Sequence, residues 1–274
     1  MAEWAKGDVI ANGVRLHYHR TGGDKPALVL SHSATDNGLY WTRVARALEQ
    51  DYDVIMYDQR GHGLSDAPES GYDFENQAVD LAGLIAALDL KRPRAIGHSG
   101  GAAIVAAVAA NYPDLLTCVI LEDPPWGTGG GEWDSQIVGM RQWFLSLGPK
   151  TREELIVGRR ASSPGWPEEE VALWAEGKLQ MSPNAIQIFE QPQPPWRDWI
   201  RKITCPILLI TSDLEQGALN TLEDVQEMAG LWHEGKAVRI NGTGHMIHCD
   251  QYEAYMQAVQ SFLAHVEARE EIAK

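Results

Sequence analysis

The sequence contains few cysteines: Cys118, Cys205 and Cys249 are the only ones among its 274 residues. They lie far apart, their number is odd, and no C-x-x-C pair occurs. A disulfide framework or a cysteine-based metal site needs paired or closely spaced thiols. We therefore expect three reduced thiols in a reducing compartment, without a disulfide and without a bound metal.

Long apolar runs are also missing. The longest run of small and apolar residues, 100–110, is far shorter than the ~20 residues of a membrane-spanning helix. The amino terminus reads M-A-E-W-A-K-G-D and has no apolar stretch of the signal-peptide type. These two features predict a cytoplasmic protein.

Basic residues are scarce as well. The chain has 23 lysines and arginines against 38 aspartates and glutamates, which gives a formal net charge of −15. Nucleic acids and anionic membranes both bind positive surfaces. We therefore expect neither as a partner, and a small molecule as the ligand.

Short strand-type runs alternate with amphipathic helical patterns over most of the chain. The runs typical of strands are 8–11, 14–19, 27–31, 54–57, 94–97, 116–121, 207–211 and 237–240. Helical spacing occurs at 40–48, 74–88, 100–111, 221–230 and 252–267. This alternation predicts an α/β fold with a mostly parallel, doubly wound sheet of about eight strands.

One stretch, 124–202, interrupts the alternation. It contains helical patterns but no good strand, and seven of the ten tryptophans fall in it. Its ten acidic and nine basic residues leave it nearly neutral. We interpret it as a helical, tryptophan-rich cap inserted into a core domain made of 1–123 and 203–274. Aromatic, near-neutral walls favour an uncharged apolar or aromatic substrate.

The segment Gly97–Gly101 reads G-H-S-G-G and fits the pattern G-x-S-x-G between a predicted strand and a small-residue helix. A serine on a sharp strand-to-helix turn projects its hydroxyl away from the backbone, and the flanking glycines avoid collisions there. The amino terminus of the next helix directs free N–H groups at an oxyanion beside the serine. We therefore predict that Ser99 is a nucleophile.

A nucleophilic serine needs a base, because a free hydroxyl is a weak nucleophile at neutral pH. His245 lies in a glycine-rich loop after the last predicted strand, and His248 is the only nearby rival. A loop at this position can carry the His245 imidazole over the sheet edge where Ser99 is expected. The Gly-x-Gly-His context favours His245.

The base needs an acid that fixes its tautomer and stabilises the imidazolium. Asp213 and Glu215 compete after the predicted strand 207–211. Asp123, after the predicted strand 116–121, is a third candidate. The residues by themselves leave this choice open.

Four motifs together resemble the α/β-hydrolase fold superfamily, of the capped serine esterase and C–C hydrolase type. The segment 28–34 resembles the family strand that ends in His-Gly before the oxyanion loop. The segment 58–65 resembles the D-x-R-G-x-G-x-S turn, 97–101 the nucleophile elbow, and 244–245 the catalytic histidine loop. The order serine, acid, histidine is the family order.

The resemblance implies roles for the matched residues. Ser99 is the expected nucleophile and His245 the base, and the backbone N–H groups of Ala34 and Gly100 form the expected oxyanion hole. In the family the acid lies about nine residues after the proline that opens its strand. Counting from Pro206 therefore predicts Glu215 as the acid, in preference to Asp213.

The chain also departs from the family pattern. Ser33 stands where the family commonly has glycine, so that the local backbone differs or its hydroxyl acts as an extra donor. A serine nucleophile argues against the branches of the fold that attack with aspartate. The turn at 58–65, with Asp58 and Arg60, is expected to be structural.

The resemblance implies hydrolysis of a carboxylic ester by a Ser-His-Glu triad through an acyl-enzyme, without metal or cofactor. A lactonase and a C–C hydrolase of ring-fission products are the alternatives, and a ligand receptor on the same fold is a third. The C–C hydrolase requires an inward-pointing arginine in the cap, because its substrate is an anion. The candidates for that arginine are Arg141, Arg159 and Arg160.

Overall fold

The computed structural model of the chain describes residues 4–126 and 133–272. Within these residues, eight strands form one sheet in the order β1-β2-β4-β3-β5-β6-β7-β8. The strands are β1 (Ala5–Ala11), β2 (Val14–Arg20), β3 (Ala27–Ser31), β4 (Asp53–Tyr57), β5 (Arg94–His98), β6 (Val119–Glu122), β7 (Ile207–Thr211) and β8 (Gly235–Arg239). Only the β1–β2 and β2–β4 pairs are antiparallel. The predicted mostly parallel sheet is confirmed.

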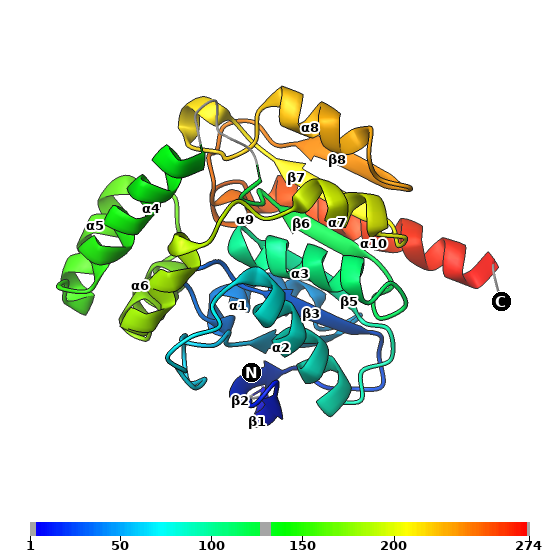
Figure 1. The fold of residues 1–274 in the computed structure, drawn as a ribbon, viewed down its shortest axis with the longest axis horizontal. Coiled ribbons are helices and arrows are strands. Elements are labelled where there is room, and N and C mark those ends of the chain that lie inside the picture. Colours follow the sequence, from blue (N-terminus) through cyan, green and yellow to red (C-terminus); the bar gives the residue numbers. More distant parts are fainter. Residues whose placement is uncertain (1–3, 127–132, 273–274) are drawn as a thin grey trace.

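Helices cover both faces of this sheet (Figure 1). They are α1 (Thr42–Leu48), α2 (Phe74–Ala87), α3 (Gly100–Asn111), α4 (Trp133–Leu147), α5 (Arg152–Ser162), α6 (Glu168–Leu179), α7 (Trp196–Lys202), α8 (Leu222–Ala229), α9 (Ile247–Asp250) and α10 (Tyr252–Ile272). Short 3₁₀ helices are η1 (Gly38–Trp41), η2 (Pro183–Glu190) and η3 (Leu214–Gln216). None of the helices in the described parts is long and apolar enough to cross a bilayer.

Successive residues of the central strands pack into two separate cores. In β3, Val29 joins the core that includes residues of α2, α3 and α7. Leu28 and Leu30 join the core that includes residues of α1 and α10. This division follows from the two-residue period of a strand, and it explains why the central strands are continuously apolar.

Helix α3 lies directly against the ends of the central strands. Its residues from Gly100 to Ala110 are all buried. A Cβ added at Gly101 would lie 2.2 Å from the carbonyl oxygen of Ser31, and one added at Gly97 would lie 2.4 Å from the carbonyl oxygen of Gly101. The small residues of the motif are therefore required by this close approach of helix and strand.

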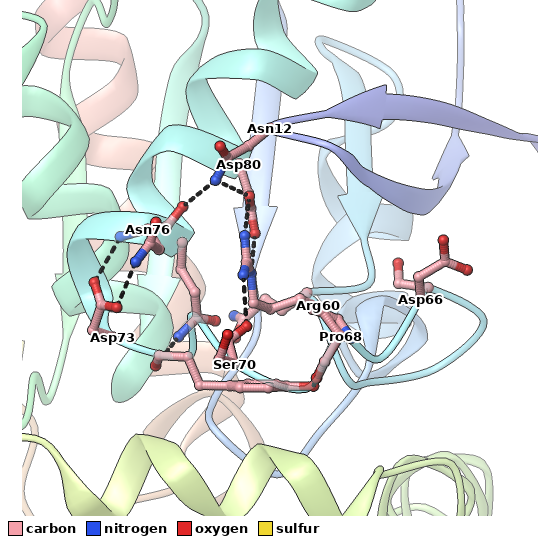
Figure 2. Close-up of polar contacts among 12 residues, drawn as sticks. Asn12, Arg60, Asp66, Pro68, Ser70, Asp73, Asn76 and Asp80 are labelled. Atoms are coloured by element: carbon pink, nitrogen blue, oxygen red, sulfur yellow. Dashed lines mark hydrogen bonds and ion pairs between the residues drawn. The ribbon is translucent and has the colours of Figure 1, made fainter.

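The turn at 58–65 joins β4 to the rest of the core through buried polar contacts. Arg60 donates two hydrogen bonds of 2.6 Å to the carboxylate of Asp80 on α2, as Figure 2 shows. Asp80 also accepts from Asn12 in the β1–β2 turn, at 2.9 Å. The carboxylate of Asp58 accepts from the amides of Gly38 and Leu64. These contacts agree with the structural role expected for the turn.

Helices α4 to α7 and η2 lie between β6 and β7 in the chain, and 133–202 contains no strand among its described residues. Helices α4, α5 and α6 gather at one end of the molecule, at the left of Figure 1. Helix α7 instead packs along α3 and contributes Trp196, Trp199 and Ile200 to the core of the sheet. The insertion thus combines a separate group of helices with one helix of the body.

The three cysteines are free and buried. Among the described residues, no group of three or more histidine, cysteine, aspartate or glutamate side chains is arranged to hold a metal ion.

Candidate active site

Ser99 occupies a strained turn between β5 and α3. Its backbone has φ 53° and ψ −121°, a positive φ that non-glycine residues rarely adopt. The strain is held in place from both sides, because the Ser99 amide donates to the Glu122 carbonyl at 2.9 Å and the Ser99 carbonyl accepts from Ala102 at 2.9 Å. The turn brings Ser99 to the wall of a cavity of about 270 Å³.

His245 lines the same cavity, and its ring is held by Asp123. The distance from His245 Nδ1 to Asp123 Oδ2 is 2.6 Å. The Asp123 side chain is fully buried, and it also accepts from the Leu219 amide at 3.0 Å and from Asn220 Nδ2 at 2.9 Å. An aspartate held in this way fixes both the orientation of the imidazole and its tautomer, with Nε2 left to accept a proton.

The expectation that Glu215 is the partner of His245 is wrong in this structure. Glu215 lies exposed on η3 and lines a different cavity, of about 190 Å³. Asp213 binds the Arg239 guanidinium at 2.9 Å and the Gly242 amide at 2.6 Å, so it stabilises the β7 and β8 loops. Counting along the sequence failed because η3 turns Glu215 away from the cavity.

Asp123, the third candidate, reaches the site because it directly continues β6. Its amide still donates to the Ile210 carbonyl of β7 at 2.9 Å, which keeps it in register with the sheet. The position immediately after a strand adjacent to β5 is the signal that points to Asp123. Sequence reasoning noted this position but ranked it last.

The amides of Ala34 and Gly100 lie close together beside Ser99. A Cβ added at Gly100 would be 3.5 Å from the Ala34 nitrogen and 3.4 Å from the Ala34 Cβ. Neither amide donates a hydrogen bond to another of the described residues. Two free N–H groups at the amino terminus of a helix and in a facing loop can together bind an oxyanion.

A second histidine–carboxylate pair lies behind the first, and sequence reasoning missed it. His248 Nδ1 is 2.9 Å from Glu122 Oε1, and the His248 amide donates to the same oxygen. Burial opposes the charged imidazole, but Cys249 and Glu122 raise the pKa of His248 well above its usual range. Glu122 and His248 thus anchor the loop that carries His245 from its inner side.

His98 supports the same loop from β5. Its Nε2 lies 2.9 Å from the His245 carbonyl oxygen, and the two rings are 4.6 Å apart. Burial lowers the pKa of His98 to about 3, so the ring is neutral and donates from Nε2. His98, at the variable position before the serine in the G-x-S-x-G motif, therefore helps to hold the loop that carries His245.

Helices α4, α5 and α6, together with η2, provide the other wall of the cavity. Trp143, Trp174 and Phe189 supply its aromatic surface. Arg159 and Lys178 also line it. Lys178 is paired with Asp36, which also lines the cavity, so Arg159 is the cation of this wall without a carboxylate partner among the described residues.

The Arg159 side chain is held between aromatic rings rather than by a carboxylate. Its Cζ lies 4.1 Å from the ring centre of Trp174 and 4.7 Å from that of Trp166. Its only hydrogen bond to a described residue joins Nη1 to Ser163 Oγ at 3.3 Å. Stacking orients the guanidinium and leaves most of its donors available to a bound anion.

Comparison with known proteins identifies the family. A family model described as alpha/beta hydrolase fold matches residues 26–252, so the chain belongs to this family. It is 30% identical to N-formylmaleamate deformylase of Pseudomonas putida over 266 residues, 95% of this chain and 97% of the relative. It is 27% identical to 2-(acetamidomethylene)succinate hydrolase of Mesorhizobium japonicum, over 89% of this chain and 90% of the relative.

A solved structure agrees with these matches. The crystal structure of a Pseudomonas putida N-formylmaleamic acid deformylase superimposes with a TM-score of 0.77 at 25% identity, over 93% of this chain and all of the other. The relatives are hydrolases, which supports a hydrolase.

Proposed function

We propose that this member of the α/β hydrolase fold family is a serine hydrolase that cleaves an acyl bond, foremost an amide, in a small carboxylate-bearing molecule. The observation that carries the proposal is that Ser99 and His245 line one cavity and that buried Asp123 contacts the His245 ring at 2.6 Å. A cavity of about 270 Å³ suits a small molecule. Acyl transfer at such a site requires no cofactor.

In the proposed reaction Ser99 Oγ attacks the substrate carbonyl carbon while His245 Nε2 accepts the hydroxyl proton. The Ala34 and Gly100 amides stabilise the resulting oxyanion. The tetrahedral intermediate collapses, and the leaving nitrogen or oxygen takes the proton from His245. Water then attacks the acyl-enzyme with His245 again as base, which releases the acid and restores Ser99. Asp123 stabilises the imidazolium in both halves of the reaction.

The position of Arg159 favours an anionic substrate over the uncharged substrate expected from the sequence. An uncharged aromatic ester would fit Trp143 and Trp174, but it would leave the Arg159 guanidinium in the cavity without an anion. A carboxylate on the substrate would fill that place, as the alternative with an inward-pointing cap arginine requires. The relatives named above are called a deformylase of N-formylmaleamate and a hydrolase of 2-(acetamidomethylene)succinate, and these names support an anionic substrate. Esters, lactones and C–C ring-fission products bearing a carboxylate are therefore ranked second.

A substrate panel tests the proposal. N-acyl amides, esters, lactones and ring-fission products are assayed in matched pairs, with and without a carboxylate. We expect turnover to favour the carboxylate-bearing amide, and Ser99→Ala to abolish it. Turnover that persists in Ser99→Ala would contradict the serine mechanism, and equal turnover within each pair would contradict the proposed anionic substrate.

Arg159→Gln should raise KM for the carboxylate-bearing substrate about 10- to 100-fold, because a hydrogen bond to a charged group contributes roughly 1.5–3 kcal/mol. The neutral member of each pair should lose much less. Arg160→Gln is the matched control, since Arg160 is an exposed neighbour on α5 that pairs with Glu168. An unchanged KM in Arg159→Gln would remove Arg159 from the substrate site.

A further inference from the structure

We infer that Lys178, on helix α6, is a positioning residue that holds the oxyanion loop 33–36 in its working conformation. The inference rests on the proposed function, because it assigns a purpose to the loop that presents the Ala34 amide. It begins from an ion pair between the cap segment and this loop. Lys178 and Asp36 are each 1% exposed at their side chains, and Lys178 Nζ contacts Asp36 Oδ1.

The ammonium group of Lys178 has no donor left for a substrate. An ammonium carries three donors. In the structure Nζ donates to the Thr35 carbonyl at 2.9 Å, to Thr35 Oγ1 at 2.9 Å, and to the Asp36 carboxylate. Lys178 therefore differs from Arg159, whose guanidinium shares the cavity but has a single hydrogen bond to a described residue. Arg159 is available for an anion, whereas Lys178 is committed to the loop.

The contacts of Asp36 continue to the peptide that carries the Ala34 N–H. The second carboxylate oxygen of Asp36 accepts from Ser33 Oγ, so the hydroxyl that replaces the family glycine has a defined partner. The Asp36 amide donates to the Ser33 carbonyl at 3.3 Å. The Ser33 carbonyl and the Ala34 N–H belong to one planar peptide unit, so fixing the carbonyl also fixes the direction of the N–H.

A buried histidine contacts the same carbonyl. The Gln59 amide donates to His32 Nε2 at 3.0 Å, so neutral His32 carries its proton on Nδ1. That Nδ1 lies 2.7 Å from the Ser33 carbonyl oxygen. Burial lowers the pKa of His32 to about 3, which keeps the ring neutral. The peptide is thus held by the core through His32 and by α6 through Asp36.

Helix α6 contacts the loop closely enough to transmit its position. A Cβ added at Gly177 would lie 3.3 Å from the Asn37 nitrogen and 3.3 Å from the Asp36 Cα. One turn on, Gln180 Oε1 accepts from Asn37 Nδ2 at 2.9 Å. Helix α6 therefore contacts the loop through its backbone at Gly177 and through the Lys178 side chain, and Gln180, just after the helix, binds the adjoining Asn37. The Ala34 N–H is therefore held in position for the oxyanion only when α6 packs against the loop.

The test compares Lys178→Met with the double variant Lys178→Met/Asp36→Leu, which removes both buried charges and so avoids an unpaired carboxylate. Hydrolysis of 4-nitrophenyl acetate is measured, together with binding of a boronic acid that forms a tetrahedral serine adduct. Lys150→Met, at an exposed lysine outside the site, is the control. We expect both variants to lose about 10²-fold in kcat with KM within threefold, as for loss of an oxyanion donor. Boronate affinity should fall in parallel.

The outcomes are separable. Wild-type kcat in the folded double variant would overturn the inference, because it would reduce Lys178 to a buried-charge partner. A raised KM with unchanged kcat would also overturn it, since Lys178 would then bind substrate directly. Full activity in Ser99→Ala would instead refute the proposed function itself.

Discussion

At the scale of single residues, Asp123 determines how the His245 ring is held. The Asp123 carboxylate forms hydrogen bonds with three groups: the His245 imidazole, the Leu219 amide and the Asn220 side chain. A carboxylate held this tightly is in place before substrate binds, which is what an acid partner of a catalytic base requires. Sequence spacing could not show this, because spacing does not reveal how a loop turns after its strand.

Asp123→Asn should lower kcat by about 10³- to 10⁴-fold, because an amide at this position favours the wrong imidazole tautomer. Glu215→Gln is the control and should stay within twofold of the wild type, since Glu215 is exposed and lines a different cavity. Steady-state kinetics on the best panel substrate measures both variants. A greater loss in Glu215→Gln would reverse the assignment.

At the scale of elements, the junction of β5 and α3 creates the site. Helix α3 approaches the strand ends so closely that only glycine fits at its second position, Gly101. Ser99, at this junction, has a positive φ of 53°. The composition of this segment is thus explained by packing, and the same junction places Ser99 at the wall of the cavity.

Gly101→Ala should destabilise the protein by about 3 kcal/mol or more, because the added methyl would overlap the Ser31 and His32 carbonyl oxygens at the end of the central strand β3. Gly139→Ala on α4 has open space around it and should be neutral or stabilising by up to about 1 kcal/mol. Urea unfolding followed by circular dichroism provides the measurement. Equal stability of the two variants would show that α3 can shift away from the sheet.

At the scale of the whole molecule, the insertion and the body form one site. The body provides Ser99, His245 and Asp123, whereas α5 and α6 provide Arg159 and Lys178. The net charge of −15 does not describe this cavity, because Arg159 lines it without a carboxylate partner among the described residues. The Lys178–Asp36 pair also ties the insertion to the body through two buried charges.

This pair predicts part of the acid sensitivity of the whole protein. Burial alone would raise the pKa of Asp36, but the charge of Lys178 and hydrogen bonds from Lys178 and Ser33 lower it to about 2. A carboxyl with a folded pKa below its unfolded value stabilises the protein above the unfolded pKa, and this stability is lost as pH falls toward the folded pKa. The ionised Asp36 therefore contributes a pH-dependent part of the stability, which is present at neutral pH and is lost in acid.

The free energy of unfolding of Asp36→Asn should consequently differ most from that of the wild type near pH 6. The difference in unfolding free energy should narrow by about 1 kcal/mol by pH 3, where the unfolded carboxyl is largely protonated. Urea unfolding of both proteins at several pH values measures it. A difference that is constant from pH 6 to pH 3 would show that the pKa of Asp36 is not depressed.

The sequence by itself determined the sheet, the positions of its strands within a few residues, and the family of the fold. Apolar runs and helical periods are local sequence patterns. Strands that are apolar throughout indicate a parallel sheet buried on both faces by helices. The segment Gly97–Gly101 and the loop before His245 were recognisable for the same reason, since each is a short segment with special backbone needs.

Only the tertiary structure decided which acid meets His245 and which cap charges enter the cavity. Asp123 and His245 are 122 residues apart in the chain, and Lys178 and Asp36 are 142 apart. Such pairs depend on how the loops turn and how the helices pack in the folded chain. The composition of a segment gives only its total charge and does not show which charged residues face the cavity. The physical reason is that strand and helix patterns are encoded locally, whereas the chemistry of the site arises from long-range contacts.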